Sequence, residues 1–313
     1  MHGWVLRSAA VLAFLVLAGP APRAAAATAG VVADATPRIA VMSAFEPELE
    51  RLLALTEDRR TVTVNGIGFT TGRLAGRPVV LVLSGISMVN AAMTTQLLLD
   101  RFSVRSLVFS GVAGGIDPAL NVGDVTVPAR WGQFLESYVA REDAGKYAPP
   151  SWATTPFPNF GMFFPTPVTV RAGTPGKGEK RFWFEASATL LETASRVAPT
   201  VALDRCTADG QCLEHAPRVV VGGNGVSGPA FVDNAGLRDY LAATFQARAT
   251  DMESAAVAMV AQQNGVPFIA FRSLSDLAGA DPDENRMYRF LALAAGNSAK
   301  VVVAFLGALP AEP

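Results

Sequence analysis

The sequence contains few of the residues on which metal sites and imidazole catalysis depend. Its 313 residues include only two Cys and two His, His2 and His215. His2 lies in an N-terminal segment that we expect to be removed, and two thiols without neighbouring His or Cys make a poor zinc site. We therefore predict no metal ion, and we expect acid–base catalysis to depend on carboxylates.

The chain also lacks an excess of positive charge. It has 26 Lys and Arg against 27 Asp and Glu, and the basic residues do not form runs. Nucleic acids and anionic membranes bind proteins that carry basic patches. We therefore expect no nucleic-acid partner, and no membrane partner once the N-terminal segment has been removed.

The N-terminal segment is organised like a secretion signal. Arg7 precedes an apolar run at residues 9–18, Gly19-Pro20 ends the run, and Ala24-Ala25-Ala26 offers a small-residue cleavage site. The run is shorter than the roughly 20 apolar residues that span a bilayer, which disfavours a membrane anchor. We predict a signal peptide at residues 1–26 and a secreted or periplasmic protein.

The two cysteines lie on either side of a short turn, Ala208-Asp209-Gly210. In an oxidising compartment, Cys206 and Cys212 could close a small disulfide loop around it. We expect the pair to be oxidised, and its role would be to hold this loop in place.

From residue 38 onward, apolar strands alternate with amphipathic helices. We expect strands at 38–42, 61–64, 69–74, 78–83, 106–110, 218–221 and 267–274, and helices from residue 46, from residue 88, near 187–198 and at 286–309. This order predicts a single α/β domain at residues 38–309 with a mixed, largely parallel central β-sheet flanked by helices.

Residues 131–217 interrupt this alternation of strands and helices. The segment is rich in Pro, Gly and aromatic residues, as in the stretch from Pro156 to Pro165. Long segments with little regular structure inside a compact domain are usually lids, binding loops or insertions. We therefore predict an insertion at about 131–217, with one helix near its end.

Five segments together carry a resemblance to a known family. They are residues 43–48, residues 83–86, residues 110–115 with 122–124, residues 226–234, and the pair Asp251-Met252-Glu253 and Ser275-Asp276. Alone, each is weak: the glycines at 111–115 fit neither the Rossmann nor the P-loop spacing, and we expect a tight turn there.

In this order, the five segments resemble the nucleoside phosphorylase/nucleosidase superfamily, and within it the 5'-methylthioadenosine/S-adenosylhomocysteine nucleosidases. The resemblance covers roughly residues 38–128 and 218–309. It implies the three-layer architecture of that superfamily. It also implies a homo-oligomer, with a dimer as the first expectation.

The resemblance implies two carboxylates for glycosidic cleavage. Asp276 matches the acid that protonates purine N7 as the C–N bond breaks, with Ser275 as a supporting hydroxyl. A proton delivered in the transition state typically contributes about 10²–10⁴-fold. Glu253 matches the glutamate that binds the ribose hydroxyls, and Met252 would pack beneath the sugar.

The water and the base have their own matching residues. Glu48 matches the residue that activates the attacking water, with a slip to Glu46 as the alternative. Phe231 matches the aromatic that stacks on the base, and the backbone of Val232 matches the amide that reads its edge. The other expected pocket residues are Phe45 and Met287 near the 5'-substituent, and Ser84, Gly85, Ala113 and Gly114.

The positions that bind anions separate hydrolysis from phosphorolysis. Phosphorylases of the superfamily carry Arg at the positions that match Phe109 and Glu48. An apolar residue and an acid cannot hold a phosphate dianion, which needs charge-assisted donors. We expect Arg272 to pair with a buried acid instead. Water is therefore the expected nucleophile.

The sequence thus predicts a secreted purine nucleosidase without metal or organic cofactor. Its substrate would be a small-molecule adenine nucleoside, such as 5'-methylthioadenosine, S-adenosylhomocysteine or adenosine, since an Asp at position 276 suits adenine. Two alternatives stay open: a phosphate-dependent purine nucleoside phosphorylase, and a non-catalytic nucleoside-binding or storage protein of the same fold.

Overall fold

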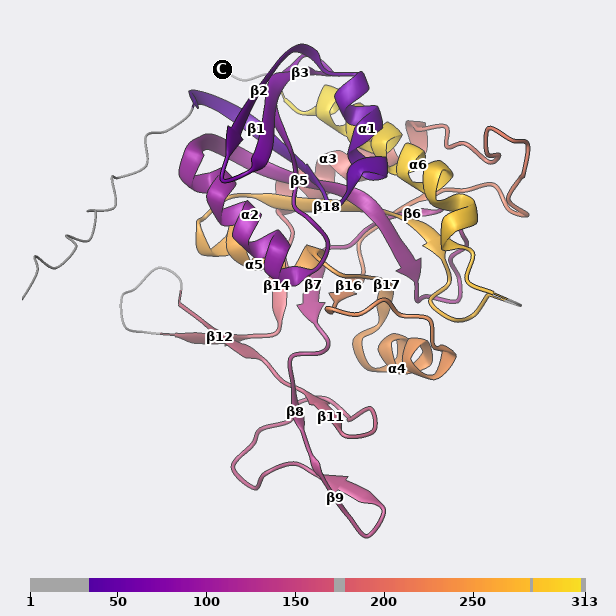
Figure 1. Ribbon diagram of the computed structural model, residues 1–313. Helices are drawn as coiled ribbons and strands as arrows, with labels where there is room; N and C mark the ends of the chain where they lie inside the picture. The colour runs from indigo at the N-terminus through magenta and orange to yellow at the C-terminus, as the bar shows by residue number, and fades with distance from the viewer. Residues whose placement is uncertain (1–33, 172–177, 282–283, 311–313) are drawn as a thin grey trace, which may run out of the picture. The chain divides into compact units, whose positions relative to one another are not determined.

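The computed structural model describes residues 34–171, 178–281 and 284–310 (Figure 1). The predicted signal peptide at residues 1–26 lies outside these ranges. The described residues include both regions in which the family resemblance was found, except residues 282–283.

A twelve-stranded mixed sheet organises the described residues. Its strands are β1 (Asp34–Ser43), β2 (Glu57–Val64), β3 (Ile67–Leu74), β4 (Arg77–Leu83), β5 (Phe102–Gly115), β6 (Val125–Val127), β7 (Arg130–Gln133), β14 (Trp183–Glu185), β15 (Val219–Val221), β16 (Asn224–Ser227), β17 (Ala247–Asp251) and β18 (Phe268–Asp276). The main path runs β14-β7-β16-β17-β5-β1-β4-β3-β2. Off this path, β18 pairs with β5, β6 pairs with β18, and β15 pairs with β6.

Parallel pairs form the centre of the sheet. β1 runs parallel to β4 and β5, β18 runs parallel to β5, and β16 runs parallel to β7 and β17. β2, β3 and β4 form an antiparallel meander, and β17 meets β5 antiparallel. The prediction of a mixed, largely parallel α/β sheet is confirmed.

Six helices in the described part of the chain accompany the sheet: α1 (Glu46–Ala54), α2 (Met88–Arg101), α3 (Ala188–Val197), α4 (Ala235–Phe245), α5 (Ser254–Gln263) and α6 (Met287–Ala308). Alternate residues of β1 show the layers: Ala40 and Met42 pack with α2 and α5, whereas Ile39 and Val41 pack with α1, α3 and α6. Because both faces of the central strands are buried, apolar residues such as 39–42 of β1 and 268–271 of β18 follow one another along the chain. Figure 1 shows this helix–sheet–helix arrangement.

α6 is the one helix in the described ranges that is long and apolar enough to cross a membrane by length and composition. Of its most apolar stretch, 67% is buried inside the protein, and Asn297 and Ser298 in the middle of the helix are fully buried. Ser298 donates to the Phe271 carbonyl of β18 at 3.1 Å. α6 therefore packs as a core helix on one face of the sheet.

The prediction of a tight turn at residues 111–115 is wrong, because β5 continues through them to Gly115. Gly111 stands opposite Arg272 of β18. A Cβ at Gly111 would collide with the Arg272 guanidinium and lie 2.5 Å from Glu48 Oε1. This glycine therefore leaves room for a buried ion pair, and it does not reverse the chain.

Part of the segment predicted as an insertion, residues 131–217, contributes strands to the central sheet. β7 and β14 belong to the central sheet, and Trp131 is fully buried. Between them, three small antiparallel pairs link β8 (Ser137–Val139) to β11 (Phe163–Pro165), β9 (Arg141–Asp143) to β10 (Lys146–Ala148), and β12 (Val168–Val170) to β13 (Glu179–Arg181). Only the middle of 131–217 stands apart from the main sheet (Figure 1).

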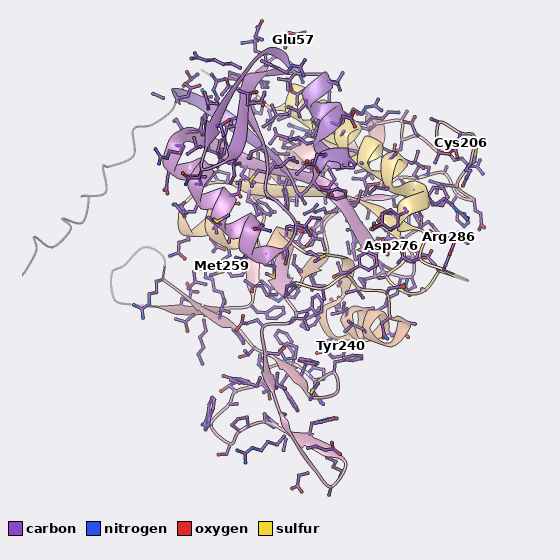
Figure 2. All side chains as sticks on the ribbon, in the orientation of Figure 1. Glu57, Cys206, Tyr240, Met259, Asp276 and Arg286 are labelled. Atoms are coloured by element: carbon purple, nitrogen blue, oxygen red, sulfur yellow. A yellow bond between two sulfur atoms is a disulfide. The ribbon has the colours of Figure 1, made fainter. Side chains whose placement is uncertain are left out.

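A disulfide joins Cys206 and Cys212 in the loop that follows α3. Figure 2 labels Cys206 in this loop. Leu213, the next residue along the chain, is buried against Val122, Phe290 and Leu293. The disulfide loop is thereby packed against α6.

Candidate active site

A cavity of about 460 Å³ lies where β1, β5, β17 and β18 end. Its wall contains eleven residues that the sequence analysis selected: Phe45, Glu48, Ala113, Gly114, Phe231, Val232, Met252, Glu253, Ser275, Asp276 and Met287. These residues come from six separate stretches of the chain. The fold therefore brings most of the predicted site into one place.

Two predicted pocket residues lie elsewhere. Ser84 and Gly85 line a neighbouring hollow of about 610 Å³, to which Glu46 also contributes. Gly85 has a φ of +76° and Ser87 a φ of 79°, and this turn carries the Ser87 N–H to Glu253 Oε1 at 2.7 Å. The segment therefore contacts the carboxylate wall through the backbone of Ser87, which the sequence analysis did not select.

Arg272 occupies the centre of the acidic wall and is fully buried. Its Nε lies 2.8 Å from Asp251 Oδ2, its Nη1 3.7 Å from Glu48 Oε1, and its Nη2 3.6 Å from Glu253 Oε2. Its guanidinium also stacks on the Phe109 ring at 4.0 Å. One cation therefore holds three buried carboxylates, where the sequence predicted pairing with one.

Glu48 is positioned by the start of α1. Its Oε2 accepts the Ala44 N–H at 2.7 Å, and its Oε1 accepts the Val112 N–H of β5 at 2.8 Å. Burial raises the pKa of Glu48, and Arg272 opposes that rise. Glu48 is 2% exposed and lines the cavity, whereas Glu46 is exposed and faces the hollow.

Glu253 immediately precedes α5 and is also buried. Burial is the main cause that raises its pKa to about 7. Arg272 counteracts the rise, and the charges of Asp251 and Glu48 add to it. Near neutral pH, Glu253 therefore exchanges its proton readily and can act as a hydrogen-bond donor or acceptor.

Asp276 ends β18 on another part of the cavity wall (Figure 2). Its Oδ2 accepts the Ser275 hydroxyl at 2.9 Å, and its Oδ1 accepts the Ala278 N–H at 2.9 Å. Burial raises the pKa of Asp276, against the effect of these donors. A carboxyl group with a raised pKa in a cavity is suited to act as a general acid.

Apolar side chains form the rest of the cavity wall. Phe231 is 54% exposed at the cavity, so its ring is not a core side chain. Val232 is buried behind it, and Met252 and Met287 add flexible apolar surface. An aromatic ring that remains accessible beside a cavity can stack on a flat heterocycle.

The described residues contain no group of three or more His, Cys, Asp or Glu that could hold a metal ion. The carboxylates of the site face a guanidinium instead. The site thus combines three features: Asp276 with its raised pKa on one part of the wall, a carboxylate cluster around one buried cation on another, and apolar side chains beside them.

Two residues with contacts at this site were not selected from the sequence. Asp251 belongs to the Asp-Met-Glu motif but had no role assigned, and it binds Arg272. Asn285 donates to Asp276 Oδ1 at 3.4 Å from the turn before α6. The signal for Asp251 was an arginine that follows the apolar run 268–271 inside the buried strand β18, whereas nothing local distinguished Asn285.

The chain was compared with known families and proteins. The family model described as "Phosphorylase superfamily" matches residues 38–307. Among curated relatives, the 5'-methylthioadenosine/S-adenosylhomocysteine nucleosidase of Geobacillus thermodenitrificans (strain NG80-2) is 32% identical over 270 residues, which cover 86% of this chain and 96% of the relative. The enzyme of the same name from Bacillus cereus (strain AH187) is 32% identical over 274 residues, covering 86% and 98%.

Solved structures show the same likeness. The 5'-methylthioadenosine/S-adenosylhomocysteine nucleosidase of Neisseria meningitidis, in complex with methylthio-immucillin-A, has a TM-score of 0.65 and 28% identity, and the match covers 87% of this chain and 99% of that one. The futalosine hydrolase of Helicobacter pylori strain 26695 has a TM-score of 0.65 and 25% identity, covering 87% and 98%.

Proposed function

The chain belongs to the phosphorylase superfamily, and from that premise we propose that it hydrolyses the N-glycosidic bond of adenine nucleosides. Its enzyme class is that of its relatives, the N-glycosidases that are named nucleosidases. The observation that carries the proposal is that Asp276, Glu253 and Glu48 line one cavity together with an accessible aromatic ring.

Asp276 would act on the purine. As the bond between the ribose carbon C1' and N9 breaks, its electron pair moves into the base, and the Asp276 carboxyl gives its proton to N7. Burial favours the neutral form that this step requires. Phe231 would stack on the base, and the Val232 backbone would bind its edge.

Glu253 and Glu48 would act on the sugar and the water. Glu253 would bind the ribose hydroxyls and stabilise the positive charge that develops on the ring. Glu48, held by the Ala44 and Val112 N–H groups, would accept a proton from the water that attacks C1'. The products would be a free purine base and a free sugar.

Water fits this wall better than phosphate does. The buried Arg272 already faces Asp251, Glu48 and Glu253, which line the cavity, so the carboxylates outnumber it. A phosphate dianion placed there would be repelled by these acids, and the buried ring of Phe109 offers it no donor. The charge balance supports hydrolysis over phosphorolysis.

The cavity also bears on the 5'-substituent. Phe45, Pro47, Ile86 and Met287 form an apolar part of its wall. An apolar wall favours a thioether over the hydroxyl of an unsubstituted nucleoside, because the hydroxyl would lose hydrogen bonds to water there. We therefore propose 5'-methylthioadenosine and S-adenosylhomocysteine as substrates ahead of adenosine.

Export and dimerisation complete the proposal. The signal-like segment at residues 1–26 supports export, and an oxidised Cys206–Cys212 pair suits an oxidising compartment. Val89 and Met93 on α2 are 81% and 57% exposed, and Ile86 just before α2 is 50% exposed. Exposed apolar side chains gathered in this way are typical of a contact between subunits.

The test is a product assay. The protein that starts at residue 27 is incubated with adenosine, inosine, 5'-methylthioadenosine or S-adenosylhomocysteine, with and without phosphate, and base and sugar are identified by chromatography. We expect adenine and a free sugar without phosphate. A phosphorylated sugar that forms only with added phosphate would show a phosphorylase, and binding without release would show a storage protein.

Variants connect the assay to the site. Asp276→Asn should lose base release while it keeps nucleoside binding, and Asp239→Asn on an exposed position of α4 is the matched control. Unchanged release by Asp276→Asn would refute the assignment of the acid.

A further inference from the structure

The turn between β18 and α6 directs two polar side chains back toward Asp276. Asn285 donates from Nδ2 to Asp276 Oδ1 at 3.4 Å. Asp281 accepts the N–H of Leu277, the residue next to Asp276, at 3.1 Å. The acid is therefore held from the turn that follows it as well as from its own strand.

The orientation of the Asn285 amide follows from its other contacts. Its Oδ1 accepts the Met287 N–H at 2.9 Å, so Nδ2 must face the opposite way. Nδ2 donates to Asp233 Oδ1 at 3.2 Å and to Asp276 Oδ1. Asn285 thus joins the acid to Asp233, the residue after Val232 in the stretch that would bind the base.

The contacts of the two Asp276 oxygens differ. Oδ1 accepts two N–H donors, from Ala278 and from the Asn285 amide, whereas Oδ2 accepts the Ser275 hydroxyl. A donor to a carboxylate oxygen favours the ionised form of the acid. The Asn285 amide therefore acts directly on the group that is to give up its proton.

Asp281 brings a charge that is only partly neutralised. Its side chain is 2% exposed, and its Oδ1 has no hydrogen-bond partner among the described residues. Arg286 approaches it only to 3.7 Å from Nε, is 30% exposed, and lines a second cavity of about 280 Å³. A guanidinium open to solvent on one side compensates a buried carboxylate incompletely.

We propose that Asn285 and Asp281 are positioning residues whose effects on the acid Asp276 have opposite signs. The proposal rests on the proposed function, in which Asp276 is the general acid. Asp281 helps the acid to keep its proton before the reaction, because a second negative charge nearby disfavours the ionised form. Asn285 stabilises the carboxylate that remains after the proton has moved to the base, because its N–H is a better partner for a charged oxygen.

The direction of both effects agrees with the electrostatics of the site. Burial is the main cause that raises the pKa of Asp276, the donors Ala278, Ser275 and Asn285 lower it, and the charge of Asp281 raises it. Other charged groups also face this region: Arg286 from the start of α6, Asp233 beside Asn285, and Asp251 and Glu253 elsewhere on the cavity wall. These groups stay in place in Asp281 and Asn285 variants, so a shift relative to wild type isolates the two residues.

The test compares two variants whose effects should have opposite signs. In Asp281→Asn the like charge is lost, the pKa of Asp276 falls, and the alkaline limb of the kcat/KM profile moves to lower pH. In Asn285→Leu the donor is lost, the pKa rises, and that limb moves to higher pH. We expect shifts of about 0.5 to 1 pH unit each. Asp239→Asn, with an exposed carboxylate on α4, should not shift the limb.

The proposal is overturned if the alkaline limbs of both variants shift in the same direction, or if both profiles coincide with that of wild type. A purely structural role would lower kcat/KM without moving the two limbs in opposite directions. If Asn285→Leu does not fold, Asn285→Asp replaces it, and the expected direction is the same because the donor becomes an acid. Folding is checked by circular dichroism.

A second readout separates this proposal from the proposed function. The carboxyl carbons of Asp are labelled with ¹³C, and the Asp276 signal is assigned by its absence in Asp276→Asn. Its titration midpoint should fall in Asp281→Asn and rise in Asn285→Leu, even if wild type releases no base. Absence of base release would refute the proposed function alone. Unchanged titration midpoints of Asp276 in both variants would refute the positioning roles of Asp281 and Asn285.

Discussion

Replacing Glu253 by Gln should make the unliganded protein more stable at alkaline pH and inactive. Glu253 is 5% exposed, and its pKa lies at about 7 instead of 4.5. At about 1.4 kcal/mol per pKa unit, this difference of about 2.5 corresponds to ~3 kcal/mol of folding free energy. The cost arises mainly because burial removes water from the ionised Glu253, and the charges of Asp251 and Glu48 around the same guanidinium add to it.

The sign of the pH dependence follows from the direction of the pKa change. The folded protein binds the Glu253 proton more tightly than the unfolded chain does. Its contribution to stability is therefore fully present below the unfolded pKa of about 4.5 and is lost as pH rises through about 7. Glu253→Gln keeps an Oε1 that can accept the Ser87 N–H but removes the titration.

Urea denaturation between about pH 5 and pH 8.5 measures this effect. Wild type should lose ~3 kcal/mol across the range, and Glu253→Gln should lose less, although the raised pKa of Glu48 leaves some slope. Part of the gain at high pH is offset because the new amide faces Arg272. Glu192→Gln on the exposed side of α3 is the control. The reasoning is refuted if Glu253→Gln keeps the wild-type slope or is the less stable protein at about pH 8.5.

Three further perturbations address other parts of the molecule. Glu48→Gln should lower kcat by about 10²–10⁴-fold with little change in KM, measured by adenine release, and a change in KM alone would contradict a role in activating water. Cys206→Ser should lower the free energy of unfolding by about 2 kcal/mol, because the bond to Cys212 closes only a small loop. Denaturation curves of wild type with added reductant should show the same loss. Val89→Glu combined with Met93→Glu should convert a dimer into a monomer in light-scattering chromatography, because both side chains are exposed apolar groups on α2; an unchanged mass would place the subunit contact elsewhere.

Much of the fold could be predicted from the sequence because the layers are encoded locally. The buried parts of β1 and β18 contain short hydrophobic runs, residues 39–42 and 268–271, as is typical of strands that are covered on both faces. Chain-reversing pairs such as Asn65-Gly66 mark hairpins by their backbone conformations. Prediction failed at β5, where glycines suggested a turn although the strand continues, because the reason for Gly111 is a side chain contributed by β18.

Some residues of the site could likewise be predicted from the sequence, and others could not. Glu253 and Asp276 could be selected because each lies in a recognisable motif, Glu253 directly before α5 and Asp276 at the end of β18, and the structure places both in one cavity. Ser84 and Gly85 were selected from the same kind of motif, yet they face the neighbouring hollow. A motif indicates which residues gather near a site, but the direction of each side chain depends on the turn that carries it.

The sequence by itself determined the alternation of strands and helices, the family resemblance and the set of carboxylates. Only the tertiary structure decided that Arg272 holds three of these acids, that Gly111 makes room for it, and that Asn285 and Asp281 bear on Asp276. The physical reason is that the charge state of a buried carboxylate depends on burial and on neighbours supplied by distant segments, and neither is visible in the residues beside it along the chain.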